Sequence, residues 1–123
     1  DAIIVSEAFL KEKPEAVKAF LRAFTKGMKD VLADPDASIK YVKERDALVD
    51  ETLEKRRMKL AIESVIATKE ARANGVGGVL TPRLTDMVTQ VSSAFELKNP
   101  VKAEAVFTDA YLPARADRMI IPK

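Results

Sequence analysis

A continuous apolar stripe between Pro14 and Ala33 constrains the fold of this chain more than any other feature of its sequence. Its members recur at steps of three, four and seven residues: Val17, Phe20, Leu21, Phe24, Met28, Val31 and Leu32. This spacing places them on one side of an α-helix. Pro14 suits the first helical turn, where its missing N–H is not needed. The segment therefore predicts an amphipathic helix that ends near Ala33.

Prolines and capping residues predict where the next helices begin. Asp34 can cap a second helix that has Pro35 at its first position and ends near Arg45. Asp50 can cap a third, which ends at Thr68 or continues for one more turn through Ala73. The apolar stripe of this third helix consists of Met58, Ala61, Ile62, Val65 and Ile66.

Two further helices flank this central part. Ser6 can cap a short helix that reaches Lys13, with Phe9 and Leu10 facing inward. Thr81 and Pro82 predict an N-cap and a first-turn proline for a late helix. Asn99 followed by Pro100 should stop that helix.

The first residues form the one β-like feature of the sequence. Ala2–Val5 is a short β-branched run, which predicts a strand buried in a sheet. The sequence offers no clear second strand to pair with it. We therefore expect a mainly α fold of about four to six helices with one short N-terminal strand. The lone strand, and a start at Asp1 without Met, lead us to expect a piece of a longer protein, with residues 1–123 as one helical segment.

Composition excludes several kinds of chemistry. The chain has no Cys and no His, so no disulfide, thiolate nucleophile or Ser-His-Asp triad can be built from it. Net charge is +2, with both signs interspersed. The densest basic stretch, Lys55–Lys59, has Glu51, Glu54 and Glu63 close by in sequence, which favours a solvated helix face over a nucleic-acid site. No apolar run is long enough to cross a membrane.

The glycine-rich and acidic stretches predict structure and not chemistry. Gly75–Gly78 lacks the Lys-Ser/Thr pair of a phosphate-binding loop and follows a helix, as a C-terminal glycine cap would. Asp34 and Asp36 are close in sequence, but helix capping accounts for Asp34. No acidic spacing matches a calcium loop. We therefore predict no metal site, no cofactor and no catalytic residue.

The C-terminal tail supplies the only candidates for ligand binding. Phe107, Tyr111 and Arg115 combine two aromatic rings with one cation in an irregular segment, which is a usable binding set. They can equally be anchors that pin the tail to the helices, and this second interpretation is favoured. Met119–Ile121 is a last apolar run, which we expect to dock on something outside this chain.

The ordered set of segments resembles one family. It comprises the initial strand, Ser6–Leu10, the Lys13–Phe20 helix, the Ala33–Ala37 turn, Asn74–Gly77, Val106–Thr108 and Tyr111–Pro113. Together these resemble the C-terminal part of NMT1/THI5-like substrate-binding proteins, over essentially all 123 residues. That family includes the nitrate, sulfonate, taurine and pyrimidine-precursor binding components of bacterial ABC importers.

The resemblance implies a two-lobed periplasmic-binding-protein α/β fold in the full-length protein, with a solute held between lobes that close by a hinge. It also implies a periplasmic or membrane-tethered extracytoplasmic location and an ABC transporter permease as partner. The family's ligand contacts come mostly from upstream sequence, so no binding residue is carried over to this chain.

Other functions remain open on the sequence alone. A small helical interaction or regulatory domain is the main alternative, and the basic run at Lys55–Lys59 is its only support. A fungal thiamine-pyrimidine synthase shares the fold class, but the resemblance implies His and Cys chemistry there, and this chain has neither residue. If this segment stands alone, its apolar stripes need cover from a compact fold, from exchanged helices or from a homodimer.

Overall fold

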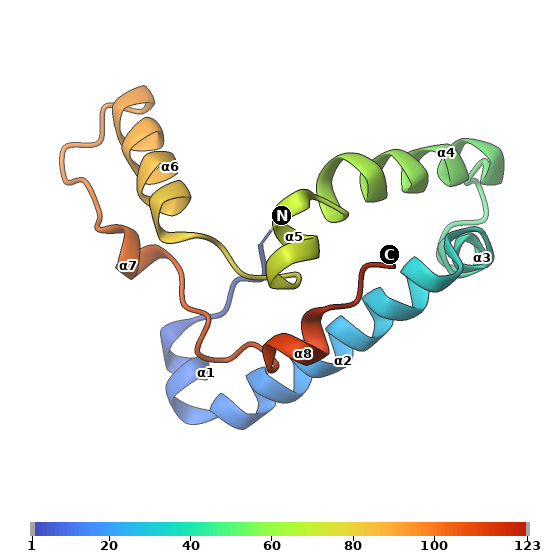
Figure 1. Cartoon of the computed structure of the whole chain (residues 1–123), viewed down its shortest axis with the longest axis horizontal. Helices are drawn as coiled ribbons and strands as arrows, with labels where there is room; N and C mark the ends of the chain where they lie inside the picture. Colours follow the sequence, from blue (N-terminus) through green and yellow to red (C-terminus); the bar gives the residue numbers. More distant parts are fainter. Residues whose placement is uncertain (1, 123) are drawn as a thin grey trace.

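The computed structural model describes residues 2–122, and this part of the chain is mainly helical (Figure 1). The α-helices are α1 (Glu7–Glu12), α2 (Pro14–Ala33), α3 (Pro35–Arg45), α4 (Glu51–Ala61), α5 (Lys69–Asn74), α6 (Thr81–Ala94), α7 (Ala103–Val106) and α8 (Arg115–Arg118). A short π-helix, Ile62–Ile66, joins α4 to α5. The mainly α prediction is confirmed. The helices are more numerous than expected because the tail and the residues after Thr68 fold into short ones.

Polar side chains cap four helices, and at three of them, Ser6, Asp34 and Asp50, the sequence predicted the cap. The Phe9 N–H donates to Ser6 Oγ at 3.3 Å, and the Ala37 N–H donates to Asp34 Oδ1 at 2.9 Å. The α4 cap is Asp50 and the α5 cap is Thr68. Each bond satisfies an N–H that has no partner inside its own helix. Local sequence therefore determines where these helices begin.

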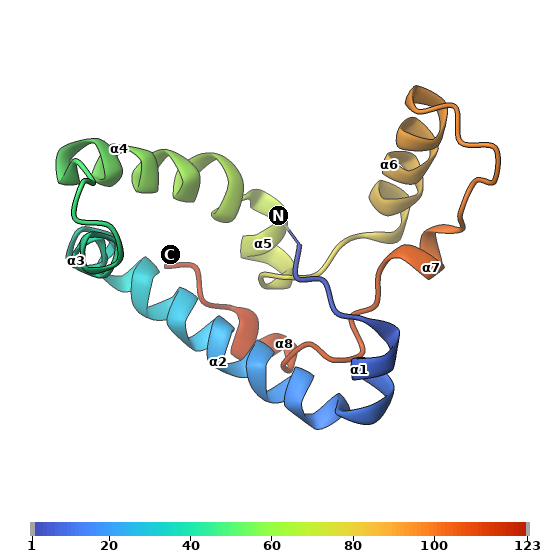
Figure 2. The ribbon, with the colours of Figure 1, turned by 180° about the vertical axis from the view of Figure 1, so that it is seen from behind.

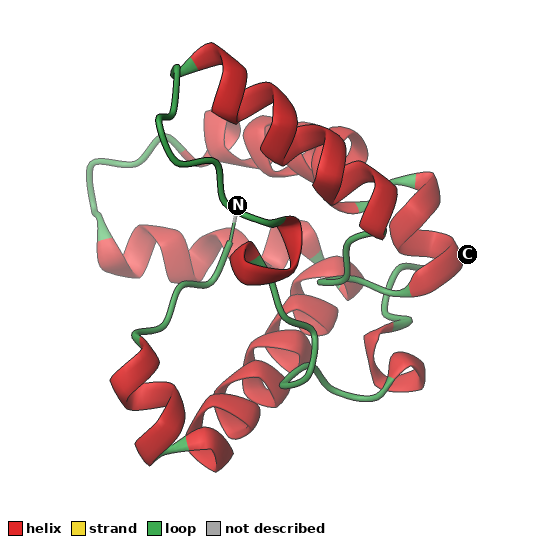
Figure 3. Cartoon of the chain, turned by 90° about the vertical axis from the view of Figure 1, so that its left-hand side faces the viewer, coloured by secondary structure: helices red, strands yellow, loops and turns green. Residues whose placement is uncertain are grey.

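The predicted strand at Ala2–Val5 is wrong. This segment has no regular secondary structure, and Ile4 is 92% exposed. Figure 3 shows helices and loops and no strand in the part of the chain that the structure describes. A strand needs a second strand to receive its backbone hydrogen bonds. Residues 2–122 provide none, so the β-branched run stays irregular.

The last long helix, α6, also differs from its prediction. Thr81 is its first residue and not its N-cap, and no side chain caps it. The helix ends at Ala94, before the expected stop at Asn99 and Pro100. Glu96 has φ +49°, and the N–H groups of Glu96 and Leu97 donate to the carbonyls of Ser93 and Ser92. This is a Schellman motif with a non-glycine residue in its left-handed position.

The core lies where the C-terminal tail meets the helices. Helices α2 and α4 are joined through α3, and the tail passes between them (Figures 1 and 2). Leu32, Val76 and Ile120 form the buried cluster, and Ile62 and Ile66 pack against it. The expectation that Met119–Ile121 docks outside this chain is therefore wrong for Ile120, which is only 8% exposed.

An ion pair spans the turn between α3 and α4. Lys43 Nζ donates to Glu51 Oε1 at 2.7 Å across this turn. The hydrogen bond and the positive charge of Lys43 lower the pKa of the Glu51 carboxyl below its ordinary value. Both side chains remain about half exposed, so solvent screening keeps the contribution of this pair to stability small.

Much of the apolar surface of the described chain is left uncovered. The accessible surface is 9771 Å², whereas a compact monomer of this mass exposes about 6,600 Å². Within residues 2–122 the buried apolar residues are few: Leu32, Ile39, Val76, Leu84, Ala103 and Ile120. Phe9, Phe20 and Phe24 were expected to face inward, yet each is about half exposed. Helix α6 packs on α7 and leaves its Met87 and Val91 side accessible.

Candidate functional site

The tail is fastened at the glycine-rich loop that follows α5. The Val76 N–H donates to the Arg118 carbonyl at 3.0 Å. In return, Arg118 Nη1 donates to the Val76 carbonyl at 2.8 Å, and its Nε donates to the Pro113 carbonyl at 3.0 Å. One arginine therefore satisfies main-chain carbonyls from two segments that are far apart in sequence.

The contact between Val76 and Arg118, called the junction below, requires glycine in the loop that follows α5. Gly75 has φ +84° and Gly77 has φ +85°, a region that L side chains rarely adopt. A Cβ on Gly75 would lie 3.0 Å from the Arg118 Cβ and 3.1 Å from the Arg118 carbonyl oxygen. The glycines thus permit the left-handed backbone and the close approach of the tail, in keeping with the structural interpretation of this loop.

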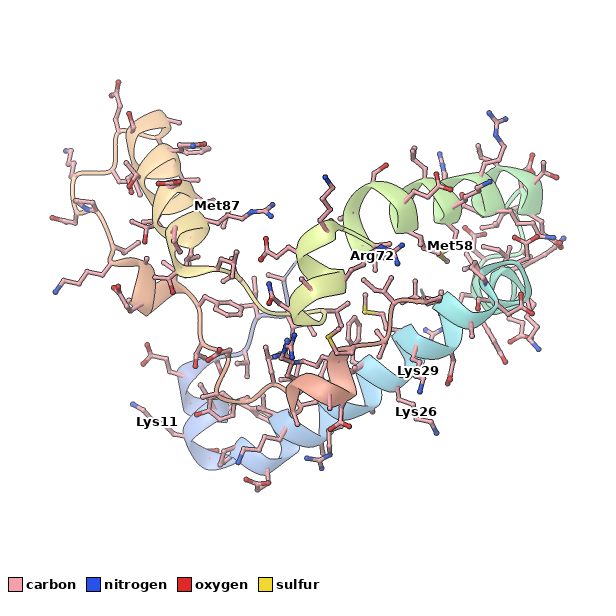
Figure 4. All side chains as sticks on the ribbon, viewed as in Figure 1. Lys11, Lys26, Lys29, Met58, Arg72 and Met87 are labelled. Atoms are coloured by element: carbon pink, nitrogen blue, oxygen red, sulfur yellow. The ribbon has the colours of Figure 1, made fainter. Side chains whose placement is uncertain are left out.

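Two further arginines donate to main-chain carbonyls in the same region. Arg115 donates through Nη2 to the Ala73 carbonyl, at the end of α5. Arg72, labelled on α5 in Figure 4, donates to the Pro122 carbonyl near the end of the tail. Arg72 and Arg115 thus connect the tail to α5, and Arg118 connects it to the loop that follows α5.

A small hollow lies between the start of α6 and the α7 region. Its volume is about 250 Å³, just below the 300–1,000 Å³ range of typical ligand pockets. Its lining combines apolar side chains, hydroxyls and two carboxylates: Val79, Thr81, Leu84, Ala103, Glu104, Phe107, Thr108 and Asp109. An arrangement of this kind can hold part of a small molecule with one apolar side and one polar side.

The three candidate binding residues lie in different surroundings. Phe107 lines the hollow. Tyr111 is half-buried and does not line it, and the Arg115 side chain bonds to the Ala73 carbonyl. Their roles in ligand binding remain predictions. Sequence reasoning did not assign Thr81, Glu104 or Asp109 to a binding site, because nothing local in the sequence shows that the start of α6 meets the α7 region.

The basic run on α4 lies among acidic partners. Arg57 Nη1 donates to Glu54 Oε1 at 2.6 Å, and Lys55 Nζ lies 4.0 Å from Asp36 Oδ2. Leu53 and Leu60 border a shallow hollow beside Arg56 and Arg57. Pairing with carboxylates reduces the local positive charge, which favours a solvated face over a surface for polyanions.

Residues 2–122 contain neither a candidate metal-ion cluster nor a helix that could span a membrane. No three carboxylates come together there in a group that could hold a metal ion. No helix in this range combines the length and the apolar character that a bilayer crossing requires.

Comparison with known proteins finds one similarity. Residues 1–38 match a family model described as NMT1/THI5 like. No curated protein and no solved structure matches the chain. The matched range covers α1, α2 and the start of α3, and it includes the Lys13–Phe20 and Ala33–Ala37 segments that carried the resemblance. The segments around Gly75, Phe107 and Tyr111 lie outside it.

Proposed function

We propose that this chain is the C-terminal helical part of a solute-binding component of an ABC importer, of the nitrate, sulfonate, taurine or pyrimidine-precursor type. The match of residues 1–38 to the NMT1/THI5-like family model is the observation that carries this proposal. In the proposed role, the chain works in the periplasm or on the outer face of a membrane. It delivers a small solute to a permease.

The helical segment has a scaffolding role in this proposal. A binding protein of this class holds its solute between two lobes, and each lobe must keep its shape while a hinge closes. The tail, fastened by Arg72, Arg115 and Arg118, holds the α5 loop against α2 and supplies that rigidity. The hollow beside Phe107 is a place on this segment where part of a small solute would fit.

A binding screen on the complete gene product that contains this chain tests the proposal. Isothermal calorimetry and thermal unfolding would be followed with nitrate, taurine, alkanesulfonates and pyrimidines. Saturable one-to-one binding of one solute class, with a rise in melting temperature, is the expected result. A gene product that is folded and binds none of these classes would count against the importer role.

A second function is favoured by a different observation. The described chain leaves uncovered many large apolar side chains, among them Phe20, Phe24 and Phe95. Exposed apolar surface of this extent is typical of protein interaction sites. A small helical interaction domain would account for it without any solute. Such a domain would bind a protein from its own cell and show no heat of binding with the small molecules of the screen.

A further inference from the structure

The end of α5 carries an Asn-Gly pair, with Asn74 as the last residue of the helix and Gly75 directly after it. Asparagine followed by glycine is especially reactive, because glycine has no Cβ to hinder attack of its main-chain nitrogen on the asparagine side chain. Asn74 is exposed. The arginines that anchor the tail bond on both sides of this pair, to the Ala73 and Val76 carbonyls.

The reaction available to this pair is deamidation. The Gly75 nitrogen loses its proton to a base such as hydroxide and bonds to Cγ of the Asn74 side chain. The side-chain amide nitrogen leaves as ammonia, and a five-membered succinimide ring remains. Water then opens the ring at one carbonyl to give aspartate or at the other to give isoaspartate. One water enters and one ammonia leaves, so no oxidant, reductant or cofactor is needed.

The folded structure withholds the nitrogen that has to attack. The Gly75 N–H donates to the Ala71 carbonyl at 2.9 Å and closes the last turn of α5. Ring closure requires this hydrogen bond to break and the Asn74 backbone to rotate out of its helical conformation. The closed turn therefore suppresses deamidation for as long as α5 stays intact.

The tail is what keeps this turn closed. Helix α5 has six residues, and isolated helices shorter than about 12–15 residues are marginal in water. Arg115 holds the Ala73 carbonyl, and Arg118 exchanges two hydrogen bonds with Val76. When the tail detaches, α5 loses these bonds, and local opening releases the Gly75 nitrogen. We propose that Asn74 is a site of spontaneous deamidation that the docked tail protects. This assignment goes beyond solute binding and does not depend on it.

Isoaspartate at this position makes the release of the tail one-way. The main chain of isoaspartate runs through the side-chain carbons, so it gains one carbon between Ala73 and Val76. The two carbonyls are held by Arg115 and Arg118 of the same short helix, α8. A longer main chain cannot keep both in register. Hydrogen exchange of the Val76 amide should be faster in the separated isoaspartyl form, and exchange as slow as in the parent would overturn this consequence.

Ageing of the purified protein in neutral buffer, followed by peptide mapping with mass spectrometry, tests the site. A carboxyl should replace the amide at Asn74, as a mixture of aspartate and isoaspartate. Asn99 is an internal control, because it precedes Pro100, whose nitrogen carries no hydrogen, and it should stay unchanged. In concentrated urea the reaction at Asn74 should be at least about tenfold faster than in the native protein. An unmodified Asn74 in urea would overturn the site, and equal rates would overturn its protection.

Arginine variants test the role of the tail. Arg118→Ala should raise the native rate at Asn74 at least about tenfold, because losing a charge-assisted hydrogen bond shifts an equilibrium by that much. In urea the variant and the parent should react equally fast. If circular dichroism shows that Arg118→Ala does not fold, Arg115→Ala takes its place, since it removes only the bond to the end of α5. A native rate that the folded variant leaves unchanged would overturn the protective role.

A buried residue away from the tail separates local opening from global unfolding. Ile39 is 1% exposed and does not belong to the cluster that contains Ile120. Ile39→Ala is therefore the matched control, because it weakens the fold without touching the contacts of the tail. The native rate at Asn74 should stay within about twofold of the parent in this variant. Acceleration as large as in Arg118→Ala would assign the opening to the whole chain and overturn the proposal.

Discussion

Val76 and Arg118 hold each other through two hydrogen bonds, one from the Val76 N–H and one from the Arg118 guanidinium. The first joins two backbones, and the second brings a charge-assisted donor to a partly buried carbonyl. Ile120 follows Arg118 by two residues and enters the cluster with Leu32 and Val76. The junction therefore determines where the tail closes the core.

Arg118→Ala should destabilise the chain by about 1.5–3 kcal/mol, because it leaves the Val76 and Pro113 carbonyls without their charged donor. The free energy of unfolding in urea, at a fixed protein concentration, measures this loss. Arg56→Ala is the control, since Arg56 is exposed on α4, and should change stability by less than about 0.5 kcal/mol. Equal effects of the two substitutions would mean that the junction contributes nothing specific.

Gly75→Ala should cost about 1–3 kcal/mol, because a side chain at φ +84° is strained and its Cβ would lie 3.0 Å from the Arg118 Cβ. Gly78→Ala is a matched control in the same loop. Its Cβ would make an ordinary contact at 3.5 Å with Arg118 Nη1. Thermal unfolding of the pair should show a clear fall in melting temperature for the first variant only. A similar fall in melting temperature for both variants would mean that replacing either glycine of this loop has the same effect, and that the conformation of Gly75 is not the cause.

Ile120→Ala should reduce stability by about 2–5 kcal/mol, since it removes a buried side chain and leaves a cavity against Leu32 and Val76. Ile4→Ala makes the same chemical change at a position that is 92% exposed. That control should be near neutral. Hydrogen exchange would locate the effect, with faster exchange of the Val76 amide in the Ile120 variant. If the two variants were equally stable, the tail would not be part of the core.

Glu96→Gly should stabilise the chain by about 0.5–1 kcal/mol. Glu96 occupies the left-handed position of the Schellman motif at the end of α6, where glycine is unstrained. Glu96→Ala keeps the Cβ strain and removes the charge, so it should show no such gain. Urea unfolding of both variants separates the backbone effect from the charge effect. A loss of stability in the glycine variant would contradict the strained conformation of this residue.

Helix starts are the part of the fold that the sequence predicts well. Ser6, Asp34 and Asp50 each bond an N–H only three residues away, so the determinant is entirely local. The same holds for α2, whose ends at Pro14 and Ala33 are as expected. Local preferences and side-chain periodicity suffice wherever partner groups lie within one or two turns of each other.

Features that depend on distant partners were not predictable in this way. The β-branched residues at Ala2–Val5 favour a strand, but a strand forms only when a second one is present. Ile120 packs against Leu32 and Val76, which lie far from it in the sequence. No local sequence pattern reveals such a contact. The Schellman motif was missed because Glu96 stands where glycine is usual. The hollow beside Phe107 likewise combines Thr81 with residues of the α7 region.

Solute uptake in the source organism tests the central claim most directly. Cells that lack the gene encoding this chain would be compared with the parent strain and with a complemented strain, using labelled nitrate, taurine, alkanesulfonates and pyrimidines at low concentration. We predict that high-affinity uptake of one of these classes is lost with the gene and restored by complementation. Unchanged uptake of every class, in a parent strain that produces the protein, would contradict the importer role.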